Sequence, residues 1–181
     1  MAEYSIFEAE AADIDRVEPL WLSMLGHHRD NPPSELVVEV PFREQGSSWE
    51  HRSERYRQWL ATDAGARLFL AQDANGRAVG YAFVRVTGAQ ASMETGRIGM
   101  LESLAVLPDQ RGSGLGTALV DTVLDHFRRL GLRQWSLEVF VGNDRVRRYY
   151  ESLGLRPYMV VMLGQVPGSA SEGVPRFEPI E

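Results

Sequence analysis

The 181-residue chain contains no cysteine. This absence excludes disulfide bonds, thiolate metal sites and a cysteine nucleophile, and therefore any reaction through an acyl-cysteine intermediate. Two further features are missing: a basic segment followed by an apolar run at the start of the chain, and any window approaching the roughly 18 apolar residues of a membrane span. We therefore expect a protein without a signal peptide or membrane partner, in a reducing compartment such as the cytoplasm.

An excess of positive charge is also absent, since the formal net charge is −6 at pH 7. An acidic surface disfavours broad nucleic-acid binding and favours a cationic partner such as an amine. The length suggests one domain, and a hydrophobic content of 44% suffices for a core. Because the end of the chain is rich in Gly, Ser and Pro, we expect a single domain over residues 1–165 and a loosely ordered tail over 166–181.

Hydrophobic periodicity predicts an α/β chain in the order one strand, two helices, three strands, helix, strand, helix, strand. Residues 30–50 are expected to be irregular, because they carry several prolines and the run Gly46–Ser48. Asp73–Gly76 predicts a hairpin turn. The expected strands cover 4–10, 67–72, 78–86, 97–106, 135–141 and 159–163, and the expected helices cover 11–29, 50–62, 114–130 and 144–153.

The most informative segment is Leu104–Leu119, where an apolar strand ends at Pro108 and a glycine-rich turn leads into an apolar stripe at helical spacing. Glycines let a backbone approach a ligand closely, and the N-terminus of the following helix suits an anion such as a pyrophosphate. The glycines at 112, 114 and 116 do not form G-x-G-x-x-G, and no Lys follows them as in a P-loop. The segment therefore predicts a phosphate-binding turn of another kind.

Two motifs together resemble the GNAT superfamily of N-acetyltransferases. Arg111-x-x-Gly114-x-Gly116, preceded by Gln110 and by Leu104-Ala105-Val106-x-Pro108, is similar to the pyrophosphate loop of that family. The stretch from Asn143 to Leu155, with Tyr150-Glu151-x-x-Gly154 inside it, is similar to its closing motif, although Val146 and Leu155 replace the usual Ala and Phe. The resemblance covers residues 67–163 and implies a mixed, mostly antiparallel sheet flanked by helices, with acetyl-CoA as the co-substrate.

The resemblance also implies which residues hold acetyl-CoA. The pantetheine arm would pair with backbone groups of the strand segment Leu104, Ala105 and Val106. The pyrophosphate would rest on the amides of Arg111, Gly112, Ser113, Gly114, Leu115, Gly116 and Thr117. Arg111 could contact a phosphate directly or simply be a solvated turn residue. Asn143 is expected to cap the helix over 144–153 through its side-chain oxygen, with a cofactor contact as a second role.

Tyr150 is the candidate general acid, since the family places this hydroxyl beside the thioester sulfur and a neutral phenol can protonate a departing thiolate. Two alternatives are that Tyr150 only packs on the pantetheine arm and that Tyr149 is the acid. Strand alternation predicts that Glu102 shares a face with Met100, Leu104 and Val106. Glu102 could be the base, a binder of the substrate cation, or one half of a structural ion pair.

Other candidate sites are weaker. No carboxylate at ligand spacing accompanies His27-His28, so no metal site is expected. Trp21, Trp49 and Trp59 could present aromatic faces to a cation, but core packing is the more probable role for Trp21 and Trp59.

The combined prediction is an N-acetyltransferase that transfers an acetyl group from acetyl-CoA to an amine by direct attack in a ternary complex. The acceptor would be a small metabolite, an antibiotic, or a protein N-terminus or lysine. The alternatives are a GNAT-like module that binds acyl-CoA without turnover and a nucleotide-binding regulatory domain outside the family. A homodimer formed through the final strand or the tail is also possible.

Overall fold

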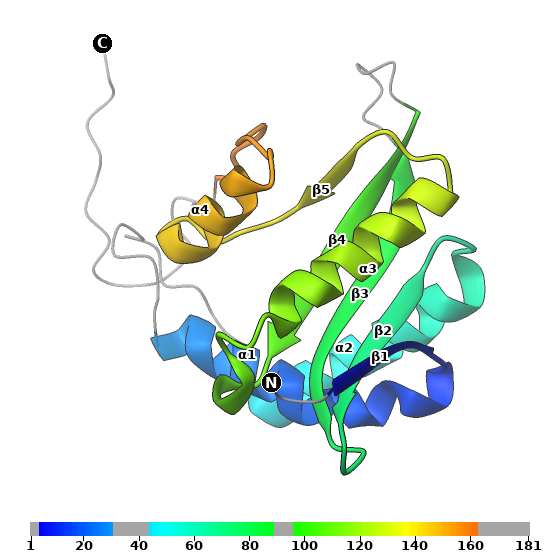
Figure 1. Ribbon diagram of the computed structural model, residues 1–181, viewed down its shortest axis with the longest axis vertical. Coiled ribbons are helices and arrows are strands. Elements are labelled where there is room, and N and C mark those ends of the chain that lie inside the picture. Colours follow the sequence, from blue (N-terminus) through cyan, green and yellow to red (C-terminus); the bar gives the residue numbers. More distant parts are fainter. Residues whose placement is uncertain (1–3, 31–43, 89–95, 163–181) are drawn as a thin grey trace, which may run out of the picture. The chain divides into compact units, whose positions relative to one another are not determined.

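The computed structural model describes residues 4–30, 44–88 and 96–162 (Figure 1). The chain divides into two compact units. The described part of the first unit covers residues 4–30, 44–88 and 96–138, and that of the second covers 139–162. The two units are described separately below.

The first unit contains a five-stranded sheet in the order β1-β2-β3-β4-β5. Neighbouring strands are antiparallel from β1 to β4, and β5 is parallel to β4. The mixed, mostly antiparallel sheet flanked by helices is therefore confirmed. The strands are β1 (Tyr4–Ala9), β2 (Arg67–Asp73), β3 (Ala78–Gly88), β4 (Arg97–Val106) and β5 (Trp135–Leu137).

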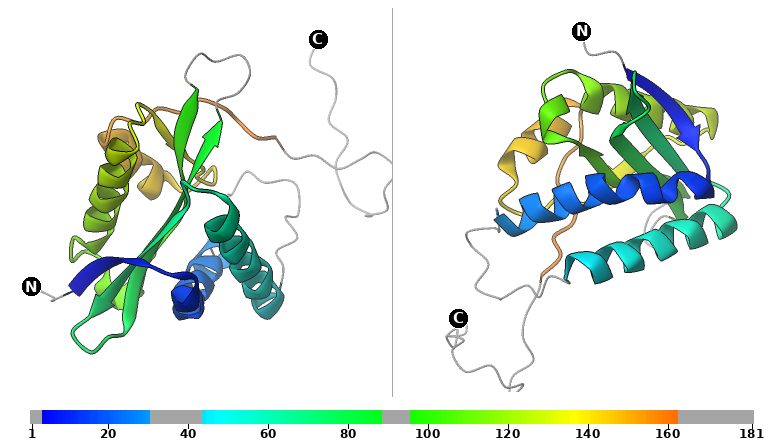
Figure 2. Two further views of the ribbon diagram at one scale, coloured as in Figure 1. Left: turned by 90° about the vertical axis from the view of Figure 1, so that its right-hand side faces the viewer. Right: turned by 90° about the horizontal axis from the view of Figure 1, so that it is seen from below.

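Helices cover both faces of this sheet, with α1 (Glu18–Asp30) and α2 (Gln45–Thr62) on one face and α3 (Leu115–Arg129) on the other (Figure 2). Tyr56 of α2 stacks on Phe83 of β3 with ring centroids 4.0 Å apart. On the opposite face Gly80 lies under α3, where a Cβ atom would come within 3.1 Å of Leu119. Odd-numbered residues of β3 therefore face α2 and even-numbered ones face α3.

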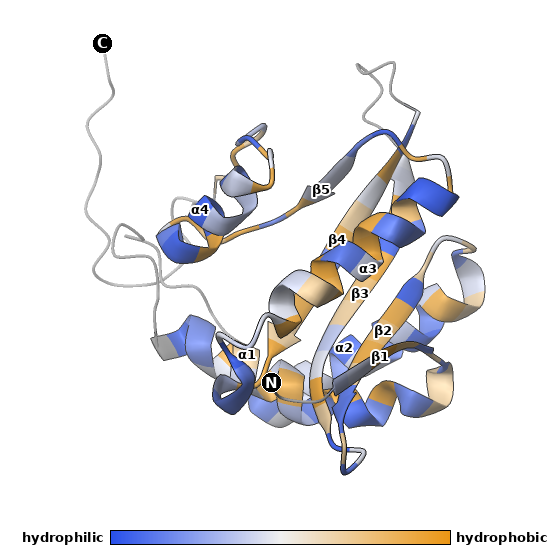
Figure 3. Cartoon of the chain, in the orientation of Figure 1, coloured by the Kyte–Doolittle hydropathy of each residue, from blue (hydrophilic) through white to orange (hydrophobic). Residues whose placement is uncertain are grey.

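The expected core is largely confirmed. The apolar stripe of α3 is buried on the sheet through Leu115, Leu119, Val123 and Phe127. Strands β2 and β3 are mostly hydrophobic along their length (Figure 3). The hairpin turn at 73–76 is also present, because the Asp73 carboxylate accepts hydrogen bonds from two amides of the turn, those of Asn75 and Arg77.

Several predicted boundaries were wrong. Helix α2 begins at Gln45 rather than at residue 50, because the amide of Ser48 already donates to Glu44 O and its buried hydroxyl accepts from Trp21 Nε1. The helix predicted over 11–29 is a 3₁₀ helix, η1 (Ala11–Val17), followed by α1. Pro19 is tolerated because it lies in the first turn of α1. Residues 31–43 of the predicted irregular segment lie outside the described residues.

The strand predicted over 135–141 ends at Leu137. Its pairing with β4 also ends there, since only Trp135, Ser136 and Leu137 have partners in β4. In the second unit, residues 159–162 of the predicted last strand are not in strand conformation, and residue 163 lies outside the described part. The helix predicted over 144–153 is confirmed as α4 (Asp144–Ser152).

A β-bulge in β4 alters the arrangement that simple alternation predicts. Ser103 lies opposite Phe83 and Leu101 lies opposite Val84, so Glu102 is an extra residue between two consecutive partners. Directly opposed residues share a face, which places Ser103 on the α2 face with Phe83 and Leu101 on the α3 face with Val84.

The bulge makes one prediction wrong. Leu104 and Val106 lie opposite Ala82 and Gly80, on the α3 face. Glu102 instead contacts Arg85, an odd-numbered residue of β3 on the α2 face. Glu102 therefore does not share a face with Leu104 and Val106, because the extra residue reverses the alternation between them.

Candidate functional site

The last residues of β4 have a free edge on the side of β5. Among the described strands, β5 pairs with β4 only as far as Leu101. The amide of Gly99, before the bulge, donates to Gln134 O beside β5 at 3.0 Å, whereas the amide of Leu107 donates to Val79 O of β3 at 3.0 Å. Gly99 and Leu107 both have odd numbers, yet their amides point to opposite sides of β4. The bulge between them has therefore reversed the alternation, so the N–H and C=O groups of Leu104 and Val106 point toward the free edge.

Ala105 lies between these two residues, and its backbone groups point the other way. It pairs with Tyr81 in the β3 ladder. The free edge therefore presents the backbone N–H and C=O groups of every second residue. An added strand or an extended ligand with amide groups pairs with a strand in this way.

The glycine-rich turn follows directly. Residues 108–110 form a short 3₁₀ turn, η2 (Pro108–Gln110), and Gly112 and Gly114 have φ angles of +80° and +89°. These left-handed conformations explain both glycines without any ligand. A Cβ atom at either position would meet nothing within 4 Å, so the space outside the turn is open.

Helix α3 starts at this turn and presents its N-terminus there (Figure 1). Its first helical hydrogen bond runs from the amide of Ala118 to Gly114 O at 3.0 Å, so the amides of residues 115–117 precede the helical ladder. Arg111 is exposed, and its Nε donates to Val106 O at 3.4 Å. The arginine thus lies between the free edge of β4 and the turn, in agreement with a role at either one.

Glu102 forms an ion pair on the α2 face. Arg85 Nη1 lies 3.0 Å from Glu102 Oε1, and Arg85 Nε lies 3.4 Å from Asp63 Oδ2. The Arg85 guanidinium also lies 4.2 Å from the centre of the Trp59 ring. Only 16% of the Glu102 side chain is exposed. Of the three roles predicted for Glu102, the ion pair is therefore present, and its second carboxylate oxygen has no partner among the described residues.

A buried hydroxyl cluster beside Glu102 was missed by the sequence reasoning. The hydroxyl of Tyr56 is hydrogen-bonded to Ser103 Oγ and lies 3.4 Å from the hydroxyl of Tyr81. All three residues are buried, and burial raises the pKa of both tyrosines. The alternation of polar and apolar residues gave no signal for it, because Ser103 reaches this face only through the bulge.

The predicted catalytic tyrosine lies in the second unit. Tyr150 of α4 is 8% exposed, and its ring centroid lies 5.1 Å from that of Tyr149. Burial, with a smaller contribution from Tyr149, raises the pKa of Tyr150 above its usual value. The phenol is therefore neutral across the physiological range and can act as a proton donor.

Asn143 precedes α4, but its predicted capping role was wrong. Its side chain makes no cap hydrogen bond, whereas its backbone carbonyl accepts from the amide of Arg147 at 2.9 Å. The backbone at Asn143, with φ −82° and ψ 61°, lies outside the extended region from which a side chain reaches the second or third amide.

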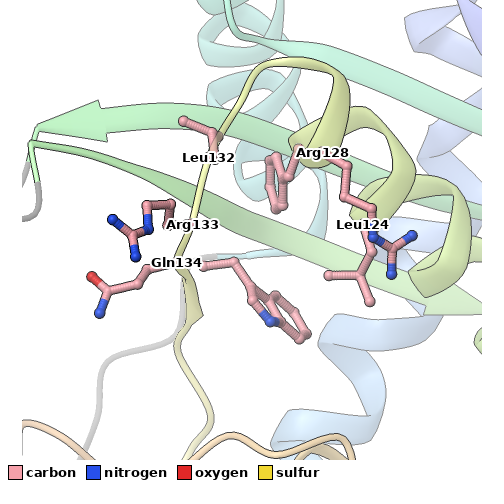
Figure 4. A pocket seen from close by; sticks show the side chains of 7 residues that line it. Leu124, Arg128, Leu132, Arg133 and Gln134 are labelled. Carbon is pink, nitrogen blue, oxygen red and sulfur yellow. The ribbon is translucent and has the colours of Figure 1, made fainter.

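A hollow in the first unit lies elsewhere, at the C-terminal end of α3 (Figure 4). It contains none of the predicted site residues, and its lining is Leu124, Phe127, Arg128, Leu132, Arg133, Gln134 and Trp135. Among residues 4–30, 44–88 and 96–162, no group of three His, Cys, Asp or Glu side chains is placed to hold a metal ion, and no helix is long and apolar enough to cross a membrane.

Comparison with known proteins identifies the family. Residues 34–155 match the model of the acetyltransferase (GNAT) family, so the chain belongs to this family. The mycothiol acetyltransferase of Thermobispora bispora is 40% identical over 117 residues, which are 65% of this chain and 39% of that protein. The chain thus spans about two fifths of the length of this curated relative.

Solved structures support the fold. The aminoglycoside antibiotic 6′-N-acetyltransferase of Acinetobacter baumannii has a TM-score of 0.65 at 18% identity, covering 92% of this chain and 100% of the other. A second aminoglycoside N-acetyltransferase, solved in complex with CoA, has a TM-score of 0.64 at 15% identity and covers 92% and 97%. At such identities the likeness concerns the fold alone.

Proposed function

We propose that the chain is an acetyl-CoA-dependent N-acetyltransferase that transfers the acetyl group to an amine by direct attack in a ternary complex. The observation that carries this proposal is the free edge of β4 after Leu101, which leads directly into the open turn at the N-terminus of α3. An extended arm with amide groups that ends in a diphosphate matches this sequence of backbone donors and acceptors.

In this proposal the cofactor contacts are those that the sequence predicts. Leu104 and Val106 pair with the amides of the pantetheine arm, while Ala105 contributes by holding the strand to β3. The pyrophosphate lies on the amides of residues 111–117, where each charge-assisted hydrogen bond stabilises it by about 1.5–3 kcal/mol. Arg111 leaves its 3.4 Å contact with Val106 O and donates to a phosphate instead.

Two side chains serve the chemistry in this proposal. Tyr150, which burial keeps in its protonated form, donates its phenolic proton to the thiolate as that group departs. The carboxylate of Glu102 holds the incoming ammonium through the oxygen that Arg85 does not use, and receives its proton directly or through water. Because no cysteine is present, the acetyl group passes to the amine without an acyl-cysteine intermediate.

The names of similar proteins suggest which acceptors to test first. Five relatives named mycothiol acetyltransferases are 32–40% identical over 57–84% of the chain. Structural neighbours include aminoglycoside acetyltransferases. All 19 basic residues of this chain are arginine, so it has no lysine of its own that could be acetylated. Lysine acetylation in a mixture would therefore be located on the acceptor protein.

Calorimetric titration with acetyl-CoA and CoA, with NAD and ATP as controls, tests the cofactor. We expect micromolar binding of the two CoA species only. Binding of ATP or NAD in preference to CoA would overturn the proposal. CoA release in the presence of a panel of amines then tests turnover. Binding of acetyl-CoA without CoA release in the presence of any amine would instead support a non-catalytic module.

A single domain over 1–165 and a homodimer remain predictions, to be tested by truncation after residue 165 and by light scattering.

A further inference from the structure

Arg52 of α2 is a half-buried cation that has no carboxylate partner among the described residues. Its guanidinium carbon lies 4.4 Å from the centre of the Trp21 ring and 5.5 Å from that of Tyr56. No acidic group of the described residues lies within ion-pair distance of it, whereas Arg57 on the same helix pairs with Asp15 at 2.6 Å. A guanidinium lying over aromatic faces keeps its N–H donors in its own plane, available for an oxyanion.

The neighbours of Arg52 connect it to the proposed reaction site. Tyr56, on which it lies, is hydrogen-bonded to Ser103, the residue after Glu102. Burial raises the pKa of Tyr56, Arg52 lowers it and Glu102 raises it, so both charges act on the same hydroxyl. The α2 face therefore carries a carboxylate and a guanidinium that both lie near one buried tyrosine, and among the described residues this guanidinium has no acid partner.

Two other arginines lie near this face. Arg85 is held by Glu102 and Asp63. Arg55 also lies over a ring, that of Trp59 at 4.7 Å, but it is exposed, whereas Arg52 is half-buried. Within the described part of the chain, Arg52 is thus a half-buried cation over Tyr56 that can receive a negative group. A guanidinium recognises carboxylates and phosphates through two parallel hydrogen bonds.

We propose that Arg52 binds an anionic group of the acceptor, so that the acceptor is an amine that also carries a carboxylate or a phosphate. This inference rests on the proposed N-acetyltransferase function. Glu102 holds the ammonium and Arg52 holds the oxyanion. A plain amine would meet Glu102 but would also be repelled by Arg52, whose charge no acidic group of the described residues neutralises.

Two matched pairs of amines test the proposal and separate the two anions: γ-aminobutyrate against butylamine, and glucosamine 6-phosphate against glucosamine. Turnover and binding to the CoA-loaded protein are both measured. We expect at least one anionic member to be preferred in the wild type. In Arg52→Gln its KM or Kd should rise roughly 10- to 100-fold, while the value for the plain partner stays constant or falls. Arg52→Lys, which keeps the charge, should restore part of the affinity.

The controls distinguish the possible failures. Arg57→Gln removes the same charge from the same helix and should leave every constant unchanged. Thermal unfolding and acetyl-CoA affinity report whether Arg52→Gln merely loosens α2. If no anionic amine is preferred or bound, or if Arg52→Gln weakens both members of a pair equally, the assignment of Arg52 is wrong. If acetyl-CoA itself does not bind, the proposed function fails first.

Discussion

Gly114 allows the charge of the proposed ligand to be tested separately from the shape of the turn. Its φ angle is +89°, and a side chain there would point into open space. Gly114→Asn and Gly114→Asp introduce side chains of the same shape, and both residues tolerate left-handed backbone better than most. Each should lose about 1–2 kcal/mol of folding free energy to backbone strain. The two variants then differ by one negative charge.

That charge acts in opposite directions on stability and on binding. A carboxylate at the N-terminus of α3 favours the helix dipole, so the Asp variant should be at least as stable as the Asn variant. Two phosphate charges about 5 Å away, at an effective dielectric constant of roughly 40–80, would be repelled by about 1.7–3.3 kcal/mol. The Asp variant should therefore bind acetyl-CoA about 15- to 250-fold more weakly than the Asn variant.

Calorimetry at low and high salt measures this difference, and urea unfolding measures stability. The gap in affinity should narrow as salt screens the repulsion. Equal affinities of the Asn and Asp variants at low salt would show that no diphosphate lies at this turn. A lower stability of the Asp variant would show that the helix-dipole reasoning is wrong.

Three further predictions concern separate parts of the chain. Tyr150→Phe should lower kcat roughly 10- to 1000-fold in steady-state assays with little change in acetyl-CoA affinity, and unchanged turnover would remove its role as the acid. Gly99→Ala should cost about 1–3 kcal/mol in urea unfolding, because the new Cβ would lie 2.7 Å from the Phe127 ring, and a neutral result would mean that this ring moves freely. Burial lowers the pKa of His126 and that of His28 below the ordinary histidine value of 6.5. The free energy of unfolding should therefore have its full value above pH 6.5 and decrease as the pH drops below 6.5. In His126→Gln, the free energy of unfolding measured in urea should depend less steeply on pH between 7.5 and 5.5, and the dependence that remains should come from His28. An unchanged pH dependence would contradict the assignment to His126.

The elements of the first unit could be predicted from the sequence because their signals are local. The stripe from Leu115 to Phe127 has helical spacing, and the Asp73–Gly76 turn has its own hydrogen-bonding residues. The glycine turn was located because left-handed backbone selects for glycine at 112 and 114. Each of these features depends on residues only a few positions apart, so a single sequence is enough to predict it.

The errors concern features that depend on a distant partner. Strand β5 ends at Leu137, where its pairing with β4 stops beside the bulge at Glu102, and the start of α2 is fixed by contacts of Ser48 with Glu44 and with Trp21, 27 residues earlier. The proposed role of Arg52 could not be predicted from its helix alone, because its contact with the Trp21 ring and its lack of an acid partner among the described residues arise only on folding. Alternation around Glu102 was misleading, since nothing in Leu101–Leu104 marks an inserted residue.

The bulge at Glu102 links the two halves of the proposed site. Without it, strand alternation would put the free backbone groups of β4 on odd-numbered residues throughout, and Ser103 would face α3 instead of Tyr56. One extra residue turns the edge groups of Leu104 and Val106 toward the proposed pantetheine arm and places Glu102 and Ser103 together on the α2 face. The proposed cofactor edge and acceptor face therefore depend on the same irregularity, and a change that removed it would be expected to impair both.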